Sequence, residues 1–213
     1  MTELLEPPKR RRAVTVERLL DAALETFAEI GFAAASVEDI CSRGGFTRGA
    51  FYSSFRTKDE LFAALYERET ARELARVEEQ LTGIEDESDP VAAAIERSLA
   101  AFRSDRTWAL VRSEYALHAA RRPEARSALS RHTLALHTQL TELIERTARR
   151  SGFNVTVPAD QLARIVLALH DGFLVRDIAA PEPGRDVGPA GDAADTDLER
   201  TALLLLLRTV IRK

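Results

Sequence analysis

The chain has 213 residues, 45% of them hydrophobic and 30% charged, with a formal net charge of −4 at pH 7. This is the balance of an ordinary globular protein that is long enough to bury a core, and it argues against a surface coated all over by nucleic acid. No apolar run reaches the roughly 20 residues of a membrane span, and the N-terminus lacks the pattern of a signal peptide. Cys41 is the single cysteine, so no intramolecular disulfide is possible. We expect a soluble, cytoplasmic protein.

Charge is unevenly distributed over the first sixty residues. Lys9–Arg12 is an unbroken basic run. Among the charged residues of 14–39, all are acidic except Arg18. The segment from residue 40 to 58 contains only basic charges, which are Arg43, Arg48, Arg56 and Lys58. Separated basic and acidic faces suit a surface that meets phosphate on one side. Charge runs also occur on faces that are merely solvated.

The first predicted helix follows the basic run. Apolar residues recur at steps of three and four from Val16 to Ile30, which indicates an amphipathic helix. Thr15 is a plausible N-cap, and Gly31 can end the helix in the left-handed conformation. We expect residues 1–13 to be a flexible arm, in which Lys9–Arg12 either lies along DNA or serves as a solubilising tail.

Two short helices follow, separated by glycines. Ser36 opens the first of them, and Asp39 makes a shortened capping box. Gly44 and Gly45 stop this helix, and Cys41 within it is expected to be a small buried hydrophobic residue. Thr47 caps the next helix. Two short helices joined by a glycine turn predict a helix-turn-helix.

The third helix has two faces. Ala50 and Phe51 fall on an apolar side, and the opposite side carries Arg48, Gly49, Tyr52 and Ser53. The pattern Thr57-x-x-Glu60 then predicts a capping box at the start of a fourth helix, with Lys58 in its first turn. A lysine there opposes the helix dipole, but it suits a phosphate that binds at the helix N-terminus.

Three stretches of this region carry a family resemblance. They are residues 22–32 (AALETFAEIGF), 36–40 (SVEDI) and 46–61 (FTRGAFYSSFRTKDEL). Over about residues 14 to 65 the sequence resembles the TetR family of transcriptional regulators. The resemblance implies an all-α homodimer with N-terminal DNA-reading heads, each built of three helices, and larger C-terminal helical domains for effector binding and dimerisation.

The resemblance also implies which residues contact DNA. Tyr52 and Lys58 match phosphate-contacting positions, and Ser54 stands where many members carry a histidine, so that its hydroxyl could donate to the same phosphate. Arg48 can bind guanine O6 and N7, or instead form an ion pair with a neighbouring carboxylate. Gly49 allows close approach of the backbone. The full set of expected DNA contacts is Ser36, Thr47, Arg48, Gly49, Ala50, Tyr52, Ser53, Ser54 and Lys58.

The rest of the chain predicts further helices. We place them near residues 58–83, 90–103, 106–120, 123–150, 158–180 and 198–212, with a mobile loop rich in Pro, Gly and Asp at about 181–197. The expected domains are the arm at 1–13, the helix-turn-helix domain at 14–60 and the ligand-binding and dimerisation domain at 61–213.

The last predicted helix contains five consecutive leucines, Leu203–Leu207, which point all round the helix axis. Burial against a second subunit accounts for them, with a wholly intramolecular core as the alternative. The expected dimer contacts are Leu162, Ile165, Val166, Leu169, Leu203, Leu206, Leu207 and Val210.

The middle helices carry aromatic and aliphatic residues that could line a pocket for an apolar or amphipathic small molecule. The candidate lining is Phe102, Trp108, Val111, Arg112, Tyr115, His118, His170 and Phe173. Glu114 and His118 lie four residues apart, but no second pair completes a metal site. We expect neither a metal nor a cofactor.

These features favour a repressor that a ligand releases from a palindromic, double-stranded DNA operator. An activator or a co-repressor-dependent regulator would have the same sequence features. A ligand-free helical interaction protein with a DNA-binding head is an alternative of another class. A helical enzyme is disfavoured because no nucleophile–base pair, paired carboxylates or phosphate-binding glycine loop is present.

Overall fold

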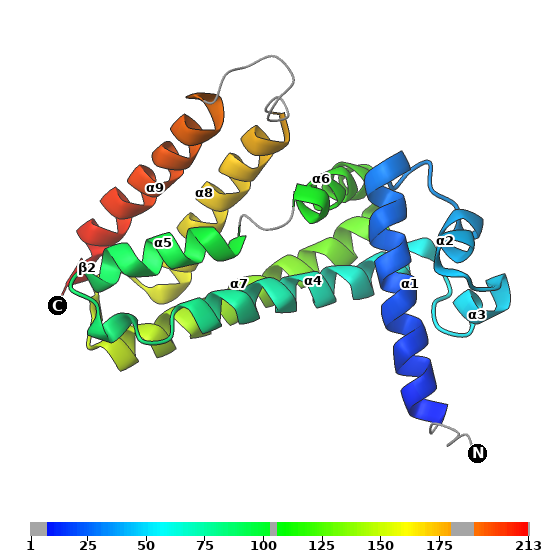
Figure 1. The fold of residues 1–213 in the computed structure, drawn as a ribbon, viewed down its shortest axis with the longest axis horizontal. Coiled ribbons are helices and arrows are strands. Elements are labelled where there is room, and N and C mark those ends of the chain that lie inside the picture. The colour runs from blue at the N-terminus through cyan, green and yellow to red at the C-terminus, as the bar shows by residue number, and fades with distance from the viewer. Residues whose placement is uncertain (1–7, 103–105, 180–189, 213) are drawn as a thin grey trace. The chain divides into compact units, whose positions relative to one another are not determined.

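The computed structural model describes residues 8–102, 106–179 and 190–212. It confirms an all-α fold (Figure 1). The α-helices are α1 (Pro8–Ile30), α2 (Val37–Gly44), α3 (Arg48–Tyr52), α4 (Lys58–Gln80), α5 (Pro90–Phe102), α6 (Arg106–Ala120), α7 (Pro123–Ser151), α8 (Ala159–Ala179) and α9 (Ala190–Val210). A 3-10 helix, η1 (Ile84–Asp86), lies between α4 and α5. Two short strands that the sequence did not predict, β1 (Asn154–Val155) and β2 (Ile211–Arg212), form an antiparallel pair.

Two helices begin earlier than expected. Helix α1 begins at Pro8 rather than after Thr15, so the backbone of Lys9–Arg12 is helical and the expected flexible arm is wrong for these residues. Proline is favoured in the first turn of a helix because its missing N–H has no helical partner there. Helix α9 begins at Ala190, and its alanine-rich first turns extend it into the loop expected at 181–197. The other residues of that loop, and residues 1–7, lie outside the described part of the chain.

The chain forms two compact units whose boundaries differ from the expected division after residue 60. The first unit comprises the residues up to Glu69 together with Leu110–His132, and the second comprises Thr70–Ala109 and Thr133–Lys213. Residues 110–132 join the first unit because their side chains pack on it. The Tyr115 ring stacks on Phe62 with 3.6 Å between ring centroids, and it meets Phe32 edge-on at 4.9 Å.

The core of the first unit contains an aromatic cluster, and α2 packs against both α1 and α3 (Figure 1). Phe27, Phe32 and Phe62 are each at most 1% exposed and pack against one another. An ion network joins α1 to α4, because the Arg68 guanidinium lies 2.8 Å from the Asp21 carboxylate and also contacts Glu17. Burial of this aromatic surface holds α1 and α4 together.

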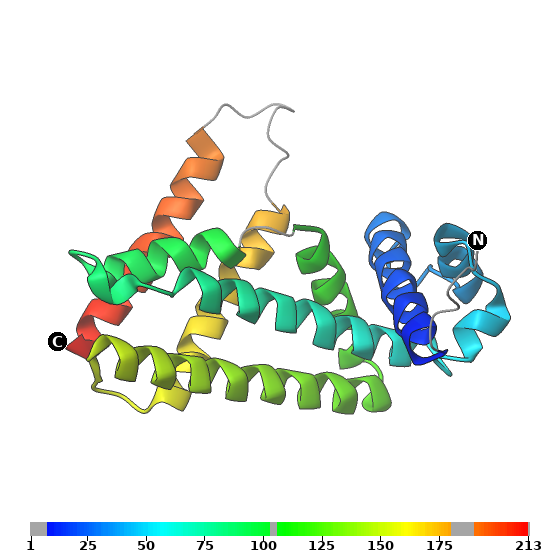
Figure 2. The ribbon, with the colours of Figure 1, turned by 60° about the horizontal axis from the view of Figure 1, so that its bottom comes forward.

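In the second unit α5 and α8 pack on the C-terminal half of α4 and on α7, and α9 packs on α5 and α8. The views in Figures 1 and 2 both show α8 beside α9. Arg200 pairs with Glu96 on α5, and Arg208 pairs with Asp89, the residue before α5, so two ion pairs join α9 to this part of the chain. Beyond α9 the short strand pair closes this end of the unit, where the Thr156 N–H donates to the Val210 carbonyl at 2.8 Å.

Candidate nucleic-acid interface and effector cavity

The helix-turn-helix has the caps that the sequence predicts. Ser36 Oγ accepts from the Asp39 N–H at 3.1 Å, and the Asp39 carboxylate accepts from the Ser36 N–H at 2.9 Å, so both halves of the capping box are present. Gly45 has a φ of 71° and ends α2 in the left-handed conformation. Thr47 Oγ1 then accepts from the Ala50 N–H at 3.2 Å and starts α3. Local hydrogen bonds therefore define both ends of the turn between the two helices.

Helix α3 has one buried and one exposed face, as expected. Phe51 is fully buried on the inner face and anchors the helix, while Tyr52 is 49% exposed. Gly49 and Ser53 are exposed as well, and Ala50 is half-buried. A Cβ placed on Gly49 would come no closer than 3.7 Å to Thr47 Oγ1, so the fold itself does not require a glycine there. The small residue instead leaves room for another molecule to approach the backbone.

Arg48 forms an ion pair on this exposed face. Its guanidinium lies 2.7 Å from the Glu38 carboxylate, and the two side chains are 62% and 54% exposed. The guanidinium is also 5.9 Å from the centroid of the Tyr52 ring. This is the alternative that the sequence left open for Arg48. An exposed ion pair contributes only about 0–1 kcal/mol, so it can break when a stronger partner arrives.

Lys58 is more enclosed than a solvent-facing phosphate ligand would be. Its Nζ donates to the carbonyls of Phe32 at 2.5 Å and Ala35 at 2.6 Å, and it lies 4.5 Å from the centroid of the Phe32 ring. Burial lowers the pKa of this ammonium below its ordinary value. A lysine has three N–H donors, so one remains for a phosphate.

Two groups at or just before the start of α4 differ from the sequence prediction. Thr57 Oγ1 accepts from the Glu60 N–H at 3.0 Å, but the Glu60 carboxylate accepts from the Arg56 N–H at 2.8 Å rather than from Thr57. The capping box is therefore displaced by one residue. Ser54 Oγ is buried and makes no hydrogen bond to the residues that the structure describes. The expectation of an exposed hydroxyl that donates to phosphate is wrong for Ser54 in this conformation.

Three arginines, Arg12, Arg18 and Arg43, bond to other groups of the first unit. Arg12 donates to the Ser53 carbonyl at 3.4 Å, which brings the end of the basic run to the end of α3. Arg18 donates to the Gly44 carbonyl at 3.3 Å. Arg43 bonds to Thr26 and pairs with Glu25 on α1, so it holds α2 against α1.

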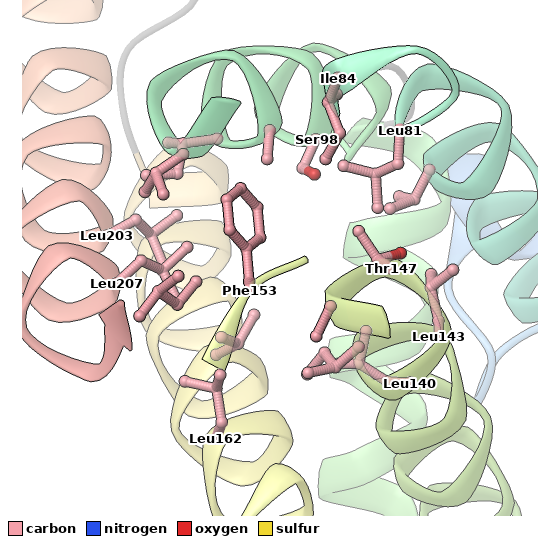
Figure 3. A pocket seen from close by; sticks show the side chains of 18 of the residues that line it. Leu81, Ile84, Ser98, Leu140, Leu143, Thr147, Phe153, Leu162, Leu203 and Leu207 are labelled. Carbon is pink, nitrogen blue, oxygen red and sulfur yellow. The ribbon is translucent and has the colours of Figure 1, made fainter. Parts of the chain in front are cut away.

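The second unit contains a cavity of about 140 Å³, in which Figure 3 shows Phe153 among the leucines. Its size resembles that of an engineered cavity in another protein that admits benzene. Most of its lining is aliphatic and comes from α4, α5, α7, α8 and α9. The apolar residues that line it are Val77, Leu81, Ile84, Val91, Ala94, Ile95, Leu99, Leu140, Leu143, Ile144, Ala148, Phe153, Val155, Leu162, Val166, Leu203, Leu207 and Ile211.

Four polar residues complete the lining: Ser98, Thr147, His170 and Glu199. Glu199 is only 5% exposed, and its Oε1 lies 3.7 Å from His170 Nδ1. Sequence reasoning missed Glu199, although a signal was present. Glu199, Leu203, Leu207 and Ile211 recur every four residues, which places the carboxylate on the face of α9 that the cavity leucines share.

The cavity does not coincide with the pocket expected from the sequence. Of the candidate residues, His170 alone is among those that line the cavity. Val111, Arg112, Tyr115 and His118 belong to the first unit, where the Tyr115 hydroxyl donates to Asp59 at 3.1 Å. Trp108 is buried in the second unit without lining the cavity, and Phe173 is half-buried outside it. Nothing is described for the side chain of Phe102.

The residues expected at a dimer contact differ in how deeply the structure buries them. Leu162 and Leu203 are 1% and 8% exposed and line the cavity, so their assignment to a dimer surface is wrong. The half-buried Val166, Leu169 and Leu207 pack against the core of the same subunit. Ile165, Leu206 and Val210 are half-buried. Sequence reasoning missed three residues that are strongly exposed on α8 and α9: Val175 at 58%, Leu198 at 47% and Leu205 at 68%.

Within the described ranges, no group of three or more His, Cys, Asp or Glu side chains is placed to hold a metal ion. Over the same ranges, no helix has the length and apolar character to cross a membrane.

Comparison with known proteins decides the family. Residues 19–65 match the family model for bacterial regulatory proteins of the tetR family, and residues 86–209 match the tetracyclin repressor-like C-terminal domain. The chain belongs to the TetR family. Its relatives include the HTH-type transcriptional repressor Rv1474c of Mycobacterium tuberculosis, which is 28% identical over 79% of this chain and 84% of its own length.

Solved structures agree with this assignment to the TetR family. GusR of Salmonella enterica superposes with a TM-score of 0.70 at 26% identity, over 97% of this chain and 100% of that chain. The regulator FadR of Bacillus subtilis, solved in complex with stearoyl-CoA, gives a TM-score of 0.63 at 17% identity, over 90% of this chain and 96% of its own, and shows the fold alone. The protein is a DNA-binding transcriptional regulator.

Proposed function

We propose that this regulator is a repressor that leaves its DNA operator when a small, largely apolar ligand enters the cavity of the second unit. The cavity carries the proposal, because an apolar space lined by helices with a few polar groups is the usual form of a small-molecule site. Two comparisons support it. The relative Rv1474c is named a repressor, and FadR has the same fold and was solved with an acyl ligand.

The proposed operator contacts come from the exposed face of α3. Arg48 exchanges the Glu38 carboxylate for the major-groove edge of a guanine, where its guanidinium can bind O6 and N7 together. Gly49 brings the backbone close to the DNA, and Tyr52 binds a phosphate. The third N–H of Lys58 binds a phosphate at the N-terminus of α4.

A homodimer would present two such heads to the two half-sites of a palindromic operator. The surfaces proposed for dimerisation are the exposed faces of α8 and α9. On α9, Leu198 and Leu205 are seven residues apart and lie on one side of the helix. On α8, Gly172 and Val175 are exposed, and a Cβ on Gly172 would meet no atom within 4 Å, so a partner helix can approach closely. Together these faces would form a four-helix contact between subunits.

Release from the operator is proposed as a shift of population. Helix α4 belongs to both units, with Lys58 in the first and Val77 in the lining of the cavity. A ligand that binds better to the arrangement with low DNA affinity increases the population of that arrangement. The affinity for DNA then falls by the same factor by which DNA weakens ligand binding.

The test combines operator binding with a ligand screen. Fluorescence anisotropy would measure binding to the DNA that flanks the protein's own gene, and a thermal-shift screen would identify apolar compounds that stabilise the protein. A stabilising compound should weaken DNA binding. A filled variant, Ala94→Phe, should bind DNA and lose the response. A compound that tightens DNA binding would instead indicate a co-repressor and contradict release.

A further inference from the structure

We propose that the polar end of the cavity selects ligands whose head group carries a positive charge or donates hydrogen bonds, and that it rejects carboxylates. The proposal rests on the cavity being the effector site, and it adds the chemical class of the effector. It follows from the placement of Glu199 and His170, which enter the cavity from α9 and α8.

Glu199 is a carboxylate in an apolar environment. It is 5% exposed, and its Oε1 lies 3.7 Å from His170 Nδ1, which is beyond the usual length of a hydrogen bond. A buried carboxylate is costly unless nearby groups donate hydrogen bonds to it or carry positive charge. A ligand that brings a hydrogen-bond donor or a positive charge to this oxygen adds to the stabilisation that His170 can give.

The rest of the lining decides which charge on a ligand head group is favoured. The residues described around the cavity include no lysine or arginine, so nothing with a permanent positive charge is available to a ligand carboxylate there. The other polar groups are the hydroxyls of Ser98 and Thr147, and Thr147 Oγ1 is buried with no partner among the described residues. Figure 3 shows both side chains among those around the cavity. A carboxylate head would be repelled by the Glu199 carboxylate with no lysine or arginine in this lining to offset the repulsion, while an ammonium or hydroxyl head would bind Glu199.

The charged group of the lining also lies at one end of it. Along α9 the cavity residues run from Glu199 to Leu207, and along α8 they run in the opposite direction from His170 to Leu162. At 1.5 Å per residue each of these stretches covers about 12 Å. The ligand is therefore an elongated amphiphile, whose apolar chain points away from the polar head at Glu199.

Three probes with the same chain and different heads test this proposal: octylamine, 1-octanol and octanoate. Isothermal titration calorimetry on the full-length protein should give the tightest binding for octylamine and weaker binding for 1-octanol. Octanoate should bind at least about tenfold more weakly than octylamine. The order of the three affinities is a test that needs no variant.

A variant then assigns the selectivity to the carboxylate. Glu199→Gln should weaken octylamine binding about tenfold and strengthen octanoate binding, while 1-octanol changes less than about threefold. Glu145→Gln, outside the cavity, should leave all three affinities unchanged. Equal affinities for the three probes, or octanoate binding most tightly, would overturn the head-group selectivity and leave the cavity as a ligand site. Binding of none of the probes would instead overturn the proposed effector cavity, and this inference with it.

Discussion

The Arg48 guanidinium and the Glu38 carboxylate lie 2.7 Å apart, and this contact joins the two helices of the helix-turn-helix on their exposed side. The side chain proposed to read a base is thus held by an acid when DNA is absent. DNA binding must break this ion pair before Arg48 can reach a guanine. Glu38 therefore competes with the operator for Arg48.

Removal of this competition should strengthen DNA binding. We expect Glu38→Gln to tighten operator binding about threefold at low salt, because an exposed ion pair contributes up to about 1 kcal/mol. Arg48→Ala should weaken binding by about 1–3 kcal/mol and relax specificity at one base pair. Fluorescence anisotropy measures both effects. Glu145→Gln, on α7, is the matched control for loss of one negative charge. Weaker binding by Glu38→Gln would show that Glu38 positions Arg48 rather than competing for it.

Lys58 should contribute to folding as well as to DNA binding. In Lys58→Met the side chain keeps its stem, but the carbonyls of Phe32 and Ala35 lose their donor. We expect the free energy of unfolding in urea to fall by about 1–3 kcal/mol. Arg56→Met is the control, since the Arg56 side chain is 89% exposed, and it should change stability by less than about 0.5 kcal/mol. Unchanged stability in Lys58→Met would mean that the two bonds contribute nothing.

The capping box of α2 gives a third prediction. Ser36→Ala removes the acceptor for the Asp39 N–H and should lower the free energy of unfolding by about 1 kcal/mol. Ser42→Ala makes the same chemical change at an exposed position inside the same helix and should be close to neutral. Urea unfolding of the two variants compares them directly. A loss of equal size in both would assign the effect to general helix propensity.

The outcome at these residues shows what sequence can predict. Ser36 and Thr47 cap their helices as expected, because a capping hydrogen bond joins residues three apart and leaves a local pattern. The hydrogen-bond partners of Lys58 are 23 and 26 positions earlier in the sequence, so no local sequence pattern predicts them. The burial of Ser54 Oγ also depends on how distant segments pack.

The five consecutive leucines of α9 illustrate the same limit. Identical residues give no periodicity, so the sequence could not tell that Leu203 lines the cavity while Leu205 is 68% exposed. The position of the cavity depends on which faces of α5, α7, α8 and α9 meet. The four-residue spacing from Glu199 to Ile211 contained part of that information.

The exposure of Leu205 leads to a prediction about assembly. Leu205→Glu should convert the proposed dimer to a monomer, because a charge at the centre of an apolar contact cannot be solvated there. Sedimentation equilibrium measures the mass. Leu134→Glu is the matched control, because Leu134 on α7 is 63% exposed, and it should leave the mass unchanged. A dimeric Leu205→Glu variant would exclude this face of α9.

His132 should make stability depend on pH. Burial lowers the pKa of its imidazole below the ordinary value, against the opposing effect of Glu67 at 3.4 Å. Between the lowered pKa and about 6.5 the unfolded chain binds more protons than the folded chain. This contribution to stability is therefore complete above pH 6.5 and is lost as pH falls through the lowered value. Urea unfolding of His132→Gln should show a smaller loss between pH 7 and pH 5. An NMR titration that places the pKa at or above 6.5 would contradict this.

The stacking of Tyr115 on Phe62 has a consequence for recombination between relatives. A crossover in α4 that exchanges only the residues before Glu69 would separate Phe62 and Phe32 from the ring of Tyr115. The Asp59 carboxylate would also lose its bond from the Tyr115 hydroxyl. A chimera that keeps the DNA specificity of this protein needs a second insert, residues 110–132, transferred together with the first. The unit that carries the DNA-binding helices therefore has to be transferred as two separate segments of the chain.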